Sequence, residues 1–337
     1  MNSKLILTST LGMSREQWLA FRKRGVGGSD VPTIMGMNPY KAEIELWYEK
    51  LSLIPELTIE NIAMFGGKRG EDLVAEDYWP YWAGTEDSVI ENYNAGKVIR
   101  KCQRVNAYIQ NPDYPWLFVS LDRKINRHGG KGEGVLEIKN TSGYEQDKWV
   151  SGIPPSNLLQ VTTQIFVTIL EYGELAILRD GRKFDVFEIE KRDKIFQSIV
   201  VKTKKFWDTV IEGRKILTQK YEAIQQSNKR LADELQAQLE LLEPEPDGSE
   251  AYEKFLKTKF RKSIAEAGLV KGTDEQYEMA LAHKNIKEQM KKLTDDAREY
   301  ENKLKRIIGD GTAIDFGKAG RVSWAGEPKR FTNKIVK

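Results

Sequence analysis

Cysteine and histidine are nearly absent from this sequence of 337 residues, which contains one cysteine, Cys102, and two histidines, His128 and His283. A single cysteine excludes an internal disulfide and makes a thiolate zinc site implausible, which fits a reducing cytoplasm. Two histidines leave little material for a histidine metal site or a Ser-His-Asp triad. Any catalytic chemistry must therefore come from carboxylates, amides, hydroxyls and basic side chains.

Long apolar runs are also missing. No stretch approaches the length of a membrane span and the N-terminus has no signal-peptide pattern, so we expect a cytoplasmic protein that does not enter a membrane. The formal net charge is only +3, which selects no class of partner. The charge is unevenly placed, because residues 318–337 hold six Lys or Arg against one acid and the remainder nets about −2.

Two strand patterns joined by a glycine-rich turn occupy the middle of the chain. The first, residues 116–125, is apolar at its start and then brings Asp122; the second, residues 134–140, carries Glu137 and Lys139 two positions apart. Side chains two residues apart on a strand point to the same face, so Glu137 and Lys139 share one. If the strands are neighbours, Asp122 joins them in a polar cluster.

Two carboxylates and a lysine favour one kind of chemistry. Mg²⁺ and Mn²⁺ prefer oxygen ligands, and such an ion lowers the pKa of bound water and offsets charge on a phosphodiester. Lys139 would hold the attacking water or stabilise the transition state as a fixed positive charge. The pattern indicates metal-assisted phosphodiester hydrolysis; the alternative is a hairpin whose charges face solvent.

A helix predicted over residues 60–82 contains a second candidate. Glu71 lies on the apolar stripe that also includes Val74, Ala75 and Tyr78. An ionised carboxylate on that stripe is costly unless it is paired or binds a metal. Strand-like segments are expected afterwards, around residues 88–91, 97–102 and 104–109.

A glycine-rich turn near the N-terminus is a candidate phosphate-binding site. Arg22 and Arg24 precede Gly27-Gly-Ser29-Asp30, and Pro32 fits the first turn of a following helix. Backbone N–H groups at a helix start, with a guanidinium nearby, can bind phosphate. The alternative is an ordinary loop.

An uncharged helix is predicted from Asn157 to about Leu170, with Gln160, Thr163 and Gln164 on its polar stripe. Two strands around an Asp180-Gly181 turn follow, over residues 175–179 and 184–189. Strand, strand, helix and strand on a mixed sheet give an α/β or α+β core.

Long charged helices begin after residue 190. Apolar seams with alternating spacings of four and three run over residues 217–242 and 279–307 and predict a helical hairpin or antiparallel coiled coil, with His283 as seam packing. The tail reads as a small basic hairpin with Val322, Trp324 and Phe331 among cations. Such a tail either binds nucleic acid through its aromatics or covers another surface.

These residues together resemble the YqaJ-type viral recombinases, which are phage exonucleases similar to lambda exonuclease within the PD-(D/E)xK superfamily. The resemblance covers roughly residues 12–190. It rests on five motifs in order: Arg22 with Gly27-Gly-Ser-Asp30, Gly67-x-x-x-Glu71, Ser120-Leu-Asp122, Leu136-Glu-Ile-Lys139 and Gln160-Val161. It implies a PD-(D/E)xK α/β core, a mixed sheet flanked by helices, over residues 1–190. Residues 191–310 would be a helical hairpin extension and residues 311–337 a basic hairpin or tail.

The resemblance also assigns roles by position. Asp122, Glu137 and the Ile138 carbonyl would bind the metal together with Glu71 from the preceding helix. Lys139 would handle the water, and Gln160 would support the water or the scissile phosphate. The residues expected at the 5′-terminal phosphate are Arg22, Arg24, Ser29 and Ser120. Leu121 replaces the proline of the superfamily name, and the choices between Arg22 and Arg24 and between Gln160 and Gln164 stay open.

The implied activity is that of a Mg²⁺-dependent deoxyribonuclease using one or two ions, with Mn²⁺ as a substitute, that degrades one strand of double-stranded DNA from a 5′ end. The 3′ strand would pass to a phage single-strand annealing protein. The resemblance also implies that the protein assembles into a trimeric ring. It further implies that a phage or prophage encodes the protein, which would act in the cytoplasm of the bacterial host. The rivals are an endonuclease with the same metal site and a non-catalytic DNA-binding or scaffold protein.

Overall fold

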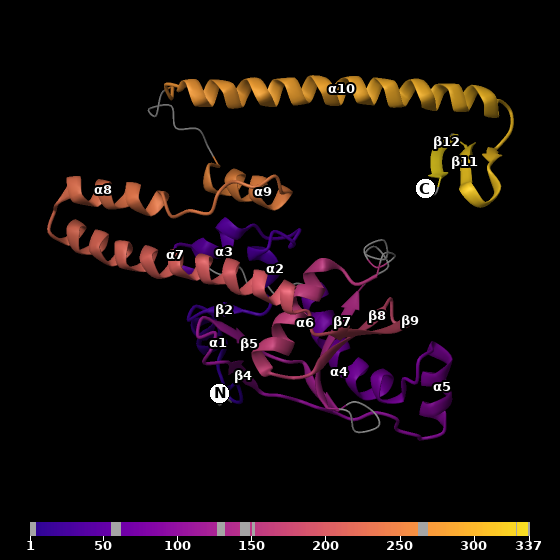
Figure 1. The fold of residues 1–337 in the computed structure, drawn as a ribbon, viewed down its shortest axis with the longest axis horizontal. Coiled ribbons are helices and arrows are strands. Elements are labelled where there is room, and N and C mark those ends of the chain that lie inside the picture. The colour runs from indigo at the N-terminus through magenta and orange to yellow at the C-terminus, as the bar shows by residue number, and fades with distance from the viewer. Residues whose placement is uncertain are drawn as a thin grey trace. The chain divides into compact units, whose positions relative to one another are not determined.

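The computed structural model describes residues 5–54, 62–126, 132–141, 149, 152–261, 269–327 and 329–335. Contacts divide the chain into two compact units, Met1–Arg261 and Lys262–Lys337 (Figure 1). The expected boundary after residue 190 falls inside the first unit, between a strand and a long helix that packs into the same core. The glycine-rich turn predicted between the two central strands lies outside the described residues at 127–131.

A mixed five-stranded sheet forms the centre of the first unit. Its order is β3-β6-β7-β8-β9, with β7 and β8 parallel and the other neighbours antiparallel. The strands are β3 (Cys102–Gln103), β6 (Arg123–Asn126), β7 (Glu133–Thr141), β8 (Tyr172–Arg179) and β9 (Lys183–Glu190). Asp180 and Gly181 turn β8 into β9 with φ of 51° and 65°, the geometry of a tight hairpin turn. The predicted fold class, α/β with a mixed sheet flanked by helices, is confirmed.

A second sheet of four strands lies in the same unit, in the order β1-β4-β5-β2. Its strands are β1 (Ile6–Ser9), β4 (Ala107–Gln110), β5 (Leu117–Val119) and β2 (Val26–Gly27). The prediction of one strand over residues 116–125 is therefore wrong, because β5 and β6 belong to different sheets. Side chains satisfy the backbone at the break: Asp122 Oδ2 accepts the Ile138 N–H at 2.8 Å, and Gln164 donates to the Ser120 carbonyl at 3.1 Å.

The helix α6 (Pro155–Thr168) connects the parallel strands β7 and β8 and confirms the predicted uncharged helix. It begins with a proline in its first turn and ends where Ile169 adopts a left-handed φ of 58°. It packs closely on β8, since a Cβ at Gly173 would lie 2.5 Å from Val161 Cγ1. This contact fixes the polar stripe of α6 over Glu137 in the middle of β7.

On the other side of β7 lies α4 (Ile62–Leu73), which continues as a π-helical turn (Val74–Tyr78) and a 3₁₀ turn (Trp79–Tyr81). The strand expected around residues 88–91 is wrong, because these residues lie within α5 (Glu86–Asn94). Thr85 accepts the Ser88 N–H at 3.3 Å as the N-cap, and acidic residues fill the first turn.

The remaining helices of the first unit are α1 (Arg15–Arg22), α2 (Val31–Ile34), α3 (Glu43–Lys50), α7 (Asp193–Gln225), α8 (Lys229–Glu240) and α9 (Glu250–Lys259). The seam predicted over residues 217–242 is not one helix, because Ser227 (φ 56°) turns the chain and Asn228 caps α8. Leu235 and Leu239 of α8 are buried in the cluster that also holds α7 residues. α7 and α8 thus form a helical hairpin, which differs from the predicted pairing of the seams over residues 217–242 and 279–307; that pairing stays a prediction.

The second unit consists of α10 (Asp274–Ile308) and a three-stranded antiparallel sheet of β10 (Ala313–Asp315), β11 (Gly320–Ala325) and β12 (Arg330–Ile335). The second predicted seam lies on α10, where His283 and the large apolar side chains are exposed, with Ile286 at 55% and Leu293 at 68%. Among the described residues, no helix combines the length and apolar character that a membrane span requires.

Candidate active site

Glu137 on β7 is the centre of the polar cluster, with a side chain only 2% exposed. Its Oε1 accepts from Lys139 Nζ at 2.5 Å and from Gln160 Nε2 at 2.7 Å, and its Oε2 accepts from Gln164 Nε2 at 2.7 Å. Lys139 is two positions away on the same strand, and the glutamines are one turn apart on α6. A buried carboxylate is tolerated here because charge and hydrogen bonds surround it.

Asp122 enters the cluster from the break between β5 and β6. Burial and the neighbouring Glu137 raise the pKa of Asp122 well above its ordinary value, against the effects of Lys139 and the Ile138 N–H. Burial and Glu137 likewise raise the pKa of Glu71. Three carboxyl groups thus face one lysine, and their mutual repulsion favours binding of a cation.

Close packing of α4 on β7 explains why Glu71 reaches this site. A Cβ at Gly70 would lie 2.2 Å from Asn140 Nδ2 on β7, so only glycine allows this approach. Asp72 on the same turn pairs with Arg123 NH2 at 2.8 Å, and Arg123 NH1 donates to the Asp122 carbonyl at 2.7 Å. These contacts link α4, β6 and β7 around the carboxylates.

The carboxylate and carbonyl oxygens of this cluster are the type of ligand that a hard divalent ion prefers. Asp122, Glu137 and the Ile138 carbonyl are the groups that would hold Mg²⁺ or Mn²⁺, with Glu71 beside them. Within the described residues, no three His, Cys, Asp or Glu side chains are gathered as a ready ligand set. Both oxygens of Glu137 are occupied by Lys139, Gln160 and Gln164.

A cavity of about 270 Å³ opens beside Lys139 and Gln160 and reaches Ser29. Gln160 lines it, whereas Gln164 is 1% exposed and also donates to the Ser120 carbonyl. The other lining residues, not anticipated from the sequence, include Asn38, Tyr40, Trp149, Ser156 and Asn157. They come from loops and helix starts, which carry no periodic signal.

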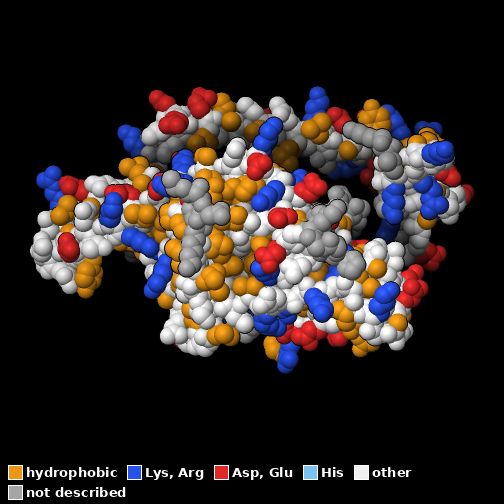
Figure 2. All heavy atoms as spheres, turned by 60° about the horizontal axis from the view of Figure 1, so that its bottom comes forward, with side chains coloured by type: hydrophobic (Ala, Val, Ile, Leu, Met, Phe, Trp, Pro, Cys, Tyr) orange, Lys and Arg blue, Asp and Glu red, His pale blue; other side chains and the backbone are white. Residues whose placement is uncertain are grey.

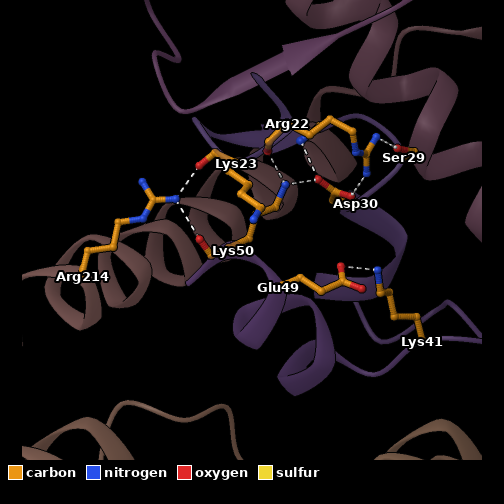
Figure 3. Close-up of polar contacts among 9 residues, drawn as sticks. Arg22, Lys23, Ser29, Asp30, Lys41, Glu49, Lys50 and Arg214 are labelled. Atoms are coloured by element: carbon orange, nitrogen blue, oxygen red, sulfur yellow. Dashed lines mark hydrogen bonds and ion pairs between the residues drawn. The ribbon is translucent and has the colours of Figure 1, made fainter. Parts of the chain in front are cut away.

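Arg22 is held beside Ser29 by a buried network that Figure 3 shows. Arg22 NH1 donates to Ser29 Oγ at 3.3 Å and NH2 pairs with Asp30 Oδ1 at 2.7 Å. Asp30 Oδ2 pairs with Lys50 Nζ at 2.7 Å. Although burial alone would raise it, the pKa of Asp30 lies far below its usual range because Lys50 and Arg22 face the carboxylate. Two cations share one carboxylate, which leaves positive charge beside Ser29.

Helix α7 supports this network from outside. Arg214 donates to the Lys23 carbonyl and, at 2.9 Å, to the Lys50 carbonyl (Figure 3). Lys50 Nζ in turn donates to the Arg22 carbonyl at 2.7 Å. Lys50 and Arg214 were not predicted from the sequence. In the sequence, a single basic residue on a charged helix cannot be distinguished from the many basic residues that face solvent.

The other two residues expected at the phosphate lie differently. The Arg24 guanidinium lies 5.8 Å from the centre of the Phe21 ring and lines a separate cavity with Gln17 and Thr8. Ser120 is exposed at the β5–β6 break, next to Asp122. The structure therefore places Arg22, and not Arg24, with Ser29. Charge alone would not have found the site, since basic and acidic side chains are interspersed over the face in Figure 2.

Residues 17–171 match the YqaJ-like viral recombinase domain. The uncharacterized protein YqaJ of Bacillus subtilis (strain 168) is 29% identical over 311 residues, covering 90% of this chain and 82% of the relative.

Two solved structures are similar over part of the chain. The alkaline exonuclease LHK-Exo from Laribacter hongkongensis has a TM-score of 0.46 at 20% identity, covering 62% of this chain and 99% of that one. A phage-related exonuclease from Haemophilus somnus 129PT has a TM-score of 0.35 at 11% identity, covering 58% and 98%. The matched segment 17–171 contains Arg22, Glu71, Asp122, Glu137, Lys139 and Gln160. Over residues 17–171, the chain is thus similar to the YqaJ-like viral recombinase domain.

Proposed function

We propose that this protein is a metal-dependent nuclease that degrades one strand of double-stranded DNA from its 5′ end. The observation that supports this most directly is the Glu137 carboxylate, held by Lys139 and two glutamines beside Asp122 and Glu71. The cavity at this cluster reaches Ser29, which lies beside Arg22.

The chain's own residues divide the chemistry among them. Asp122, Glu137 and the Ile138 carbonyl would hold a divalent ion, which when bound would lower the pKa of a water and polarise the phosphodiester. Burial lowers the pKa of Lys139, but Glu137 and Asp122 outweigh it and the net pKa is raised. Lys139 therefore stays protonated at neutral pH and acts as a cation and hydrogen-bond donor, not as a base. It can orient the attacking water and stabilise charge on the phosphate.

The positive charge beside Ser29 suits recognition of a terminal phosphate. Ser29 presents a hydroxyl at the cavity and Arg22 donates to that hydroxyl, while the buried Asp30 and Lys50 hold Arg22 in place. A 5′-terminal phosphate bound there would place the adjoining nucleotide at Lys139 and Gln160. This arrangement supports cleavage from a 5′ end.

The wider biological role is proposed from the family. LHK-Exo is described as an alkaline exonuclease and the domain matched is that of viral recombinases. We infer that the 3′ strand passes to a phage single-strand annealing protein during recombination in a bacterial cytoplasm. A trimeric ring around the DNA would make degradation processive.

Release of nucleotides from a linear duplex, 5′-phosphorylated on one strand only, tests the proposal. We expect selective loss of the phosphorylated strand with Mg²⁺, none with EDTA, and a strong loss with Lys139→Ala. With Arg22→Gln the preference for the phosphorylated strand should fall, whereas Arg24→Gln should retain it. Cleavage of a closed circle would favour an endonuclease, and binding without turnover would favour a scaffold protein.

A further inference from the structure

The strand register of the second unit places the aromatic residues of β11 and β12 on the opposite face of the sheet from the cations of these two strands. Trp324 is paired with Phe331 and Val322 with Asn333, so these side chains share one face of the sheet. Lys305 of α10 lies 5.9 Å from the Trp324 ring centre and 5.5 Å from that of Phe331. Val322 is only 2% exposed. The aromatics therefore pack against α10 and are not a platform for stacking bases.

The opposite face collects the basic residues. Arg321 is paired with Lys334, and Ala325 with Arg330, which places all three cations on that face. Arg321, Arg330 and Lys334 are all exposed. Between them, the Ser323 and Thr332 hydroxyls lie 2.6 Å apart. This set of five residues is called the basic face below.

The basic face has the shape and donors of a phosphate-binding surface. Arg330 and Lys334 are four residues apart on β12, which separates them by about 13 Å along the strand. Arg321 lies about 5 Å from Lys334 across the sheet. Arginine, lysine and hydroxyl groups supply most protein contacts to nucleic-acid phosphates. Ala313 and Ala325 add no bulk that would keep a polynucleotide away.

Opposing charge on this face is small. Among the described residues, the register adds one acid, Asp315, whose Oδ1 already accepts the Gly317 N–H at 2.9 Å. Residues 311–337 contain six Lys or Arg and two acids, which gives this segment a net charge of +4. The net charge of the whole chain is +3. The second unit thus concentrates the positive charge of the protein.

We infer that the basic face is a second DNA-binding site, which holds the phosphate backbone without sequence preference and apart from the catalytic cluster. The choice of DNA as the nucleic acid rests on the proposed function. An extended row of cations and hydroxyls fits a regular chain of phosphates, which a folded acidic protein surface does not present. The strand that it holds is either the duplex ahead of cleavage or the single-stranded product.

Salt-dependent binding by the full-length chain in EDTA tests this inference, because no cleavage then occurs. The probes are a fluorescent single strand of mixed sequence and the matching blunt duplex. The variant is Arg321→Gln with Arg330→Gln and Lys334→Gln, and its matched control is Lys284→Gln with Lys287→Gln and Lys291→Gln on the exposed surface of α10. Both change the charge equally, and thermal unfolding with Trp fluorescence checks that each folds.

Loss of three phosphate contacts should reduce the slope of log K against log salt by about 2 to 3 and weaken binding at least about tenfold at physiological salt. The control should bind as the wild type does. The probe that shows the larger change identifies the strand held.

Equal slopes for wild type and the Arg321 variant, or equal losses in the control, would overturn the inference. Competition by poly-glutamate as effective as by DNA would replace DNA with an acidic protein. Turnover with Mg²⁺ is measured separately. Salt-dependent binding without turnover would contradict only the proposed function. Turnover together with a salt slope that the Arg321 variant leaves unchanged would contradict only the inference that the basic face binds DNA.

Discussion

Asp122 shows how a single residue carries a conflict between stability and function. Its pKa is raised by burial and by Glu137, so the folded chain binds the proton more tightly than the unfolded chain does. Such a group adds stability at low pH, and that stability is lost as pH rises through the folded pKa. At neutral pH the ionised carboxylate therefore costs stability, which a bound cation would offset.

We predict that Asp122→Asn raises the melting temperature of the metal-free protein at neutral pH, by about 2–4 °C for each kcal/mol of repulsion relieved. The asparagine oxygen can still accept the Ile138 N–H that Asp122 accepts at 2.8 Å. Nucleotide release should fall strongly in the same variant. Thermal unfolding in EDTA is the measurement, and a lower melting temperature would contradict this reading of the site.

Substitutions can distinguish the roles of the two glutamines of α6. Gln164 is 1% exposed and serves both Glu137 and the Ser120 carbonyl, so Gln164→Leu should cost about 1–3 kcal/mol of unfolding free energy. Gln160 lines the cavity, so Gln160→Leu should leave stability within about 1 kcal/mol and lower the rate. Denaturant unfolding and initial rates measure the two effects. The opposite pattern would make Gln164 the residue that acts on substrate.

At the scale of the elements, α4 and β7 approach closely because residue 70 is glycine. Gly70→Ala would drive a Cβ into Asn140, whose Nδ2 lies 2.2 Å from that position, and should displace Glu71 and lower activity. Gly67→Ala on the same helix meets nothing within 4 Å and should stabilise the helix by up to about 1 kcal/mol. Rates and melting temperatures of both variants measure this.

A second substitution identifies the cause of the Gly70→Ala defect. Removing the opposing side chain with Asn140→Ala should restore activity to the Gly70→Ala variant, because the clash is with that side chain. No recovery in the double variant would show that the contact between α4 and β7 is not what positions Glu71.

Sequence patterns located α6, the β8–β9 hairpin and the β6–β7 pairing, because each is local and periodic. They missed the break at Ser120–Asp122, since Leu121 continues the apolar pattern through it. At the break, Gln164, on a helix far along the chain, donates to the Ser120 carbonyl, and the Asp122 carboxylate accepts the Ile138 N–H of β7. No local pattern contains that information.

Two further predictions, the strand around residues 88–91 and the single seam over residues 217–242, were wrong because they also relied on local pattern. The α5 region contains strand-forming residues, but Thr85 and two acids at its start favour a helix. The apolar spacing of residues 217–242 continues across the turn at Ser227 although the chain reverses there. The α8 side chains buried with α7 are Ala232, Leu235 and Leu239, whereas Tyr221, Ile224 and Leu231 are exposed, so the spacing did not predict which face is buried.

For the candidate site, the motifs named the residues that the structure gathers around Glu137, but not the network behind Arg22. Asp30 belongs to the Gly27-Gly-Ser-Asp30 motif, which gives it no partner, and Lys50 lies in none of the motifs. The two meet because α2 and α3 pack together, which places a buried lysine against a buried aspartate at 2.7 Å. The pairing depends on the fold and cannot be seen in one sequence.

At the scale of the whole molecule, the two units have different roles in this account. The first holds the carboxylate cluster and its cavity, and the second holds the basic face. The helical extension proposed for residues 191–310 is shared between them, because α7 and α8 pack with the core and α10 belongs to the second unit. Catalysis and DNA binding by the basic face would thus be separable by substitution.

The most direct test of the central claim is the initial rate of nucleotide release from a 5′-phosphorylated duplex by Glu137→Gln. Glu133→Gln on the same strand is the matched control, since that side chain is 53% exposed and pairs with Lys124. We predict that Glu137→Gln lowers the rate at least about a thousandfold, with DNA binding in EDTA retained, and that Glu133→Gln changes it little. A rate for Glu137→Gln within about threefold of wild type, corresponding to less than about 1 kcal/mol, would show that this carboxylate is not at the centre of the chemistry.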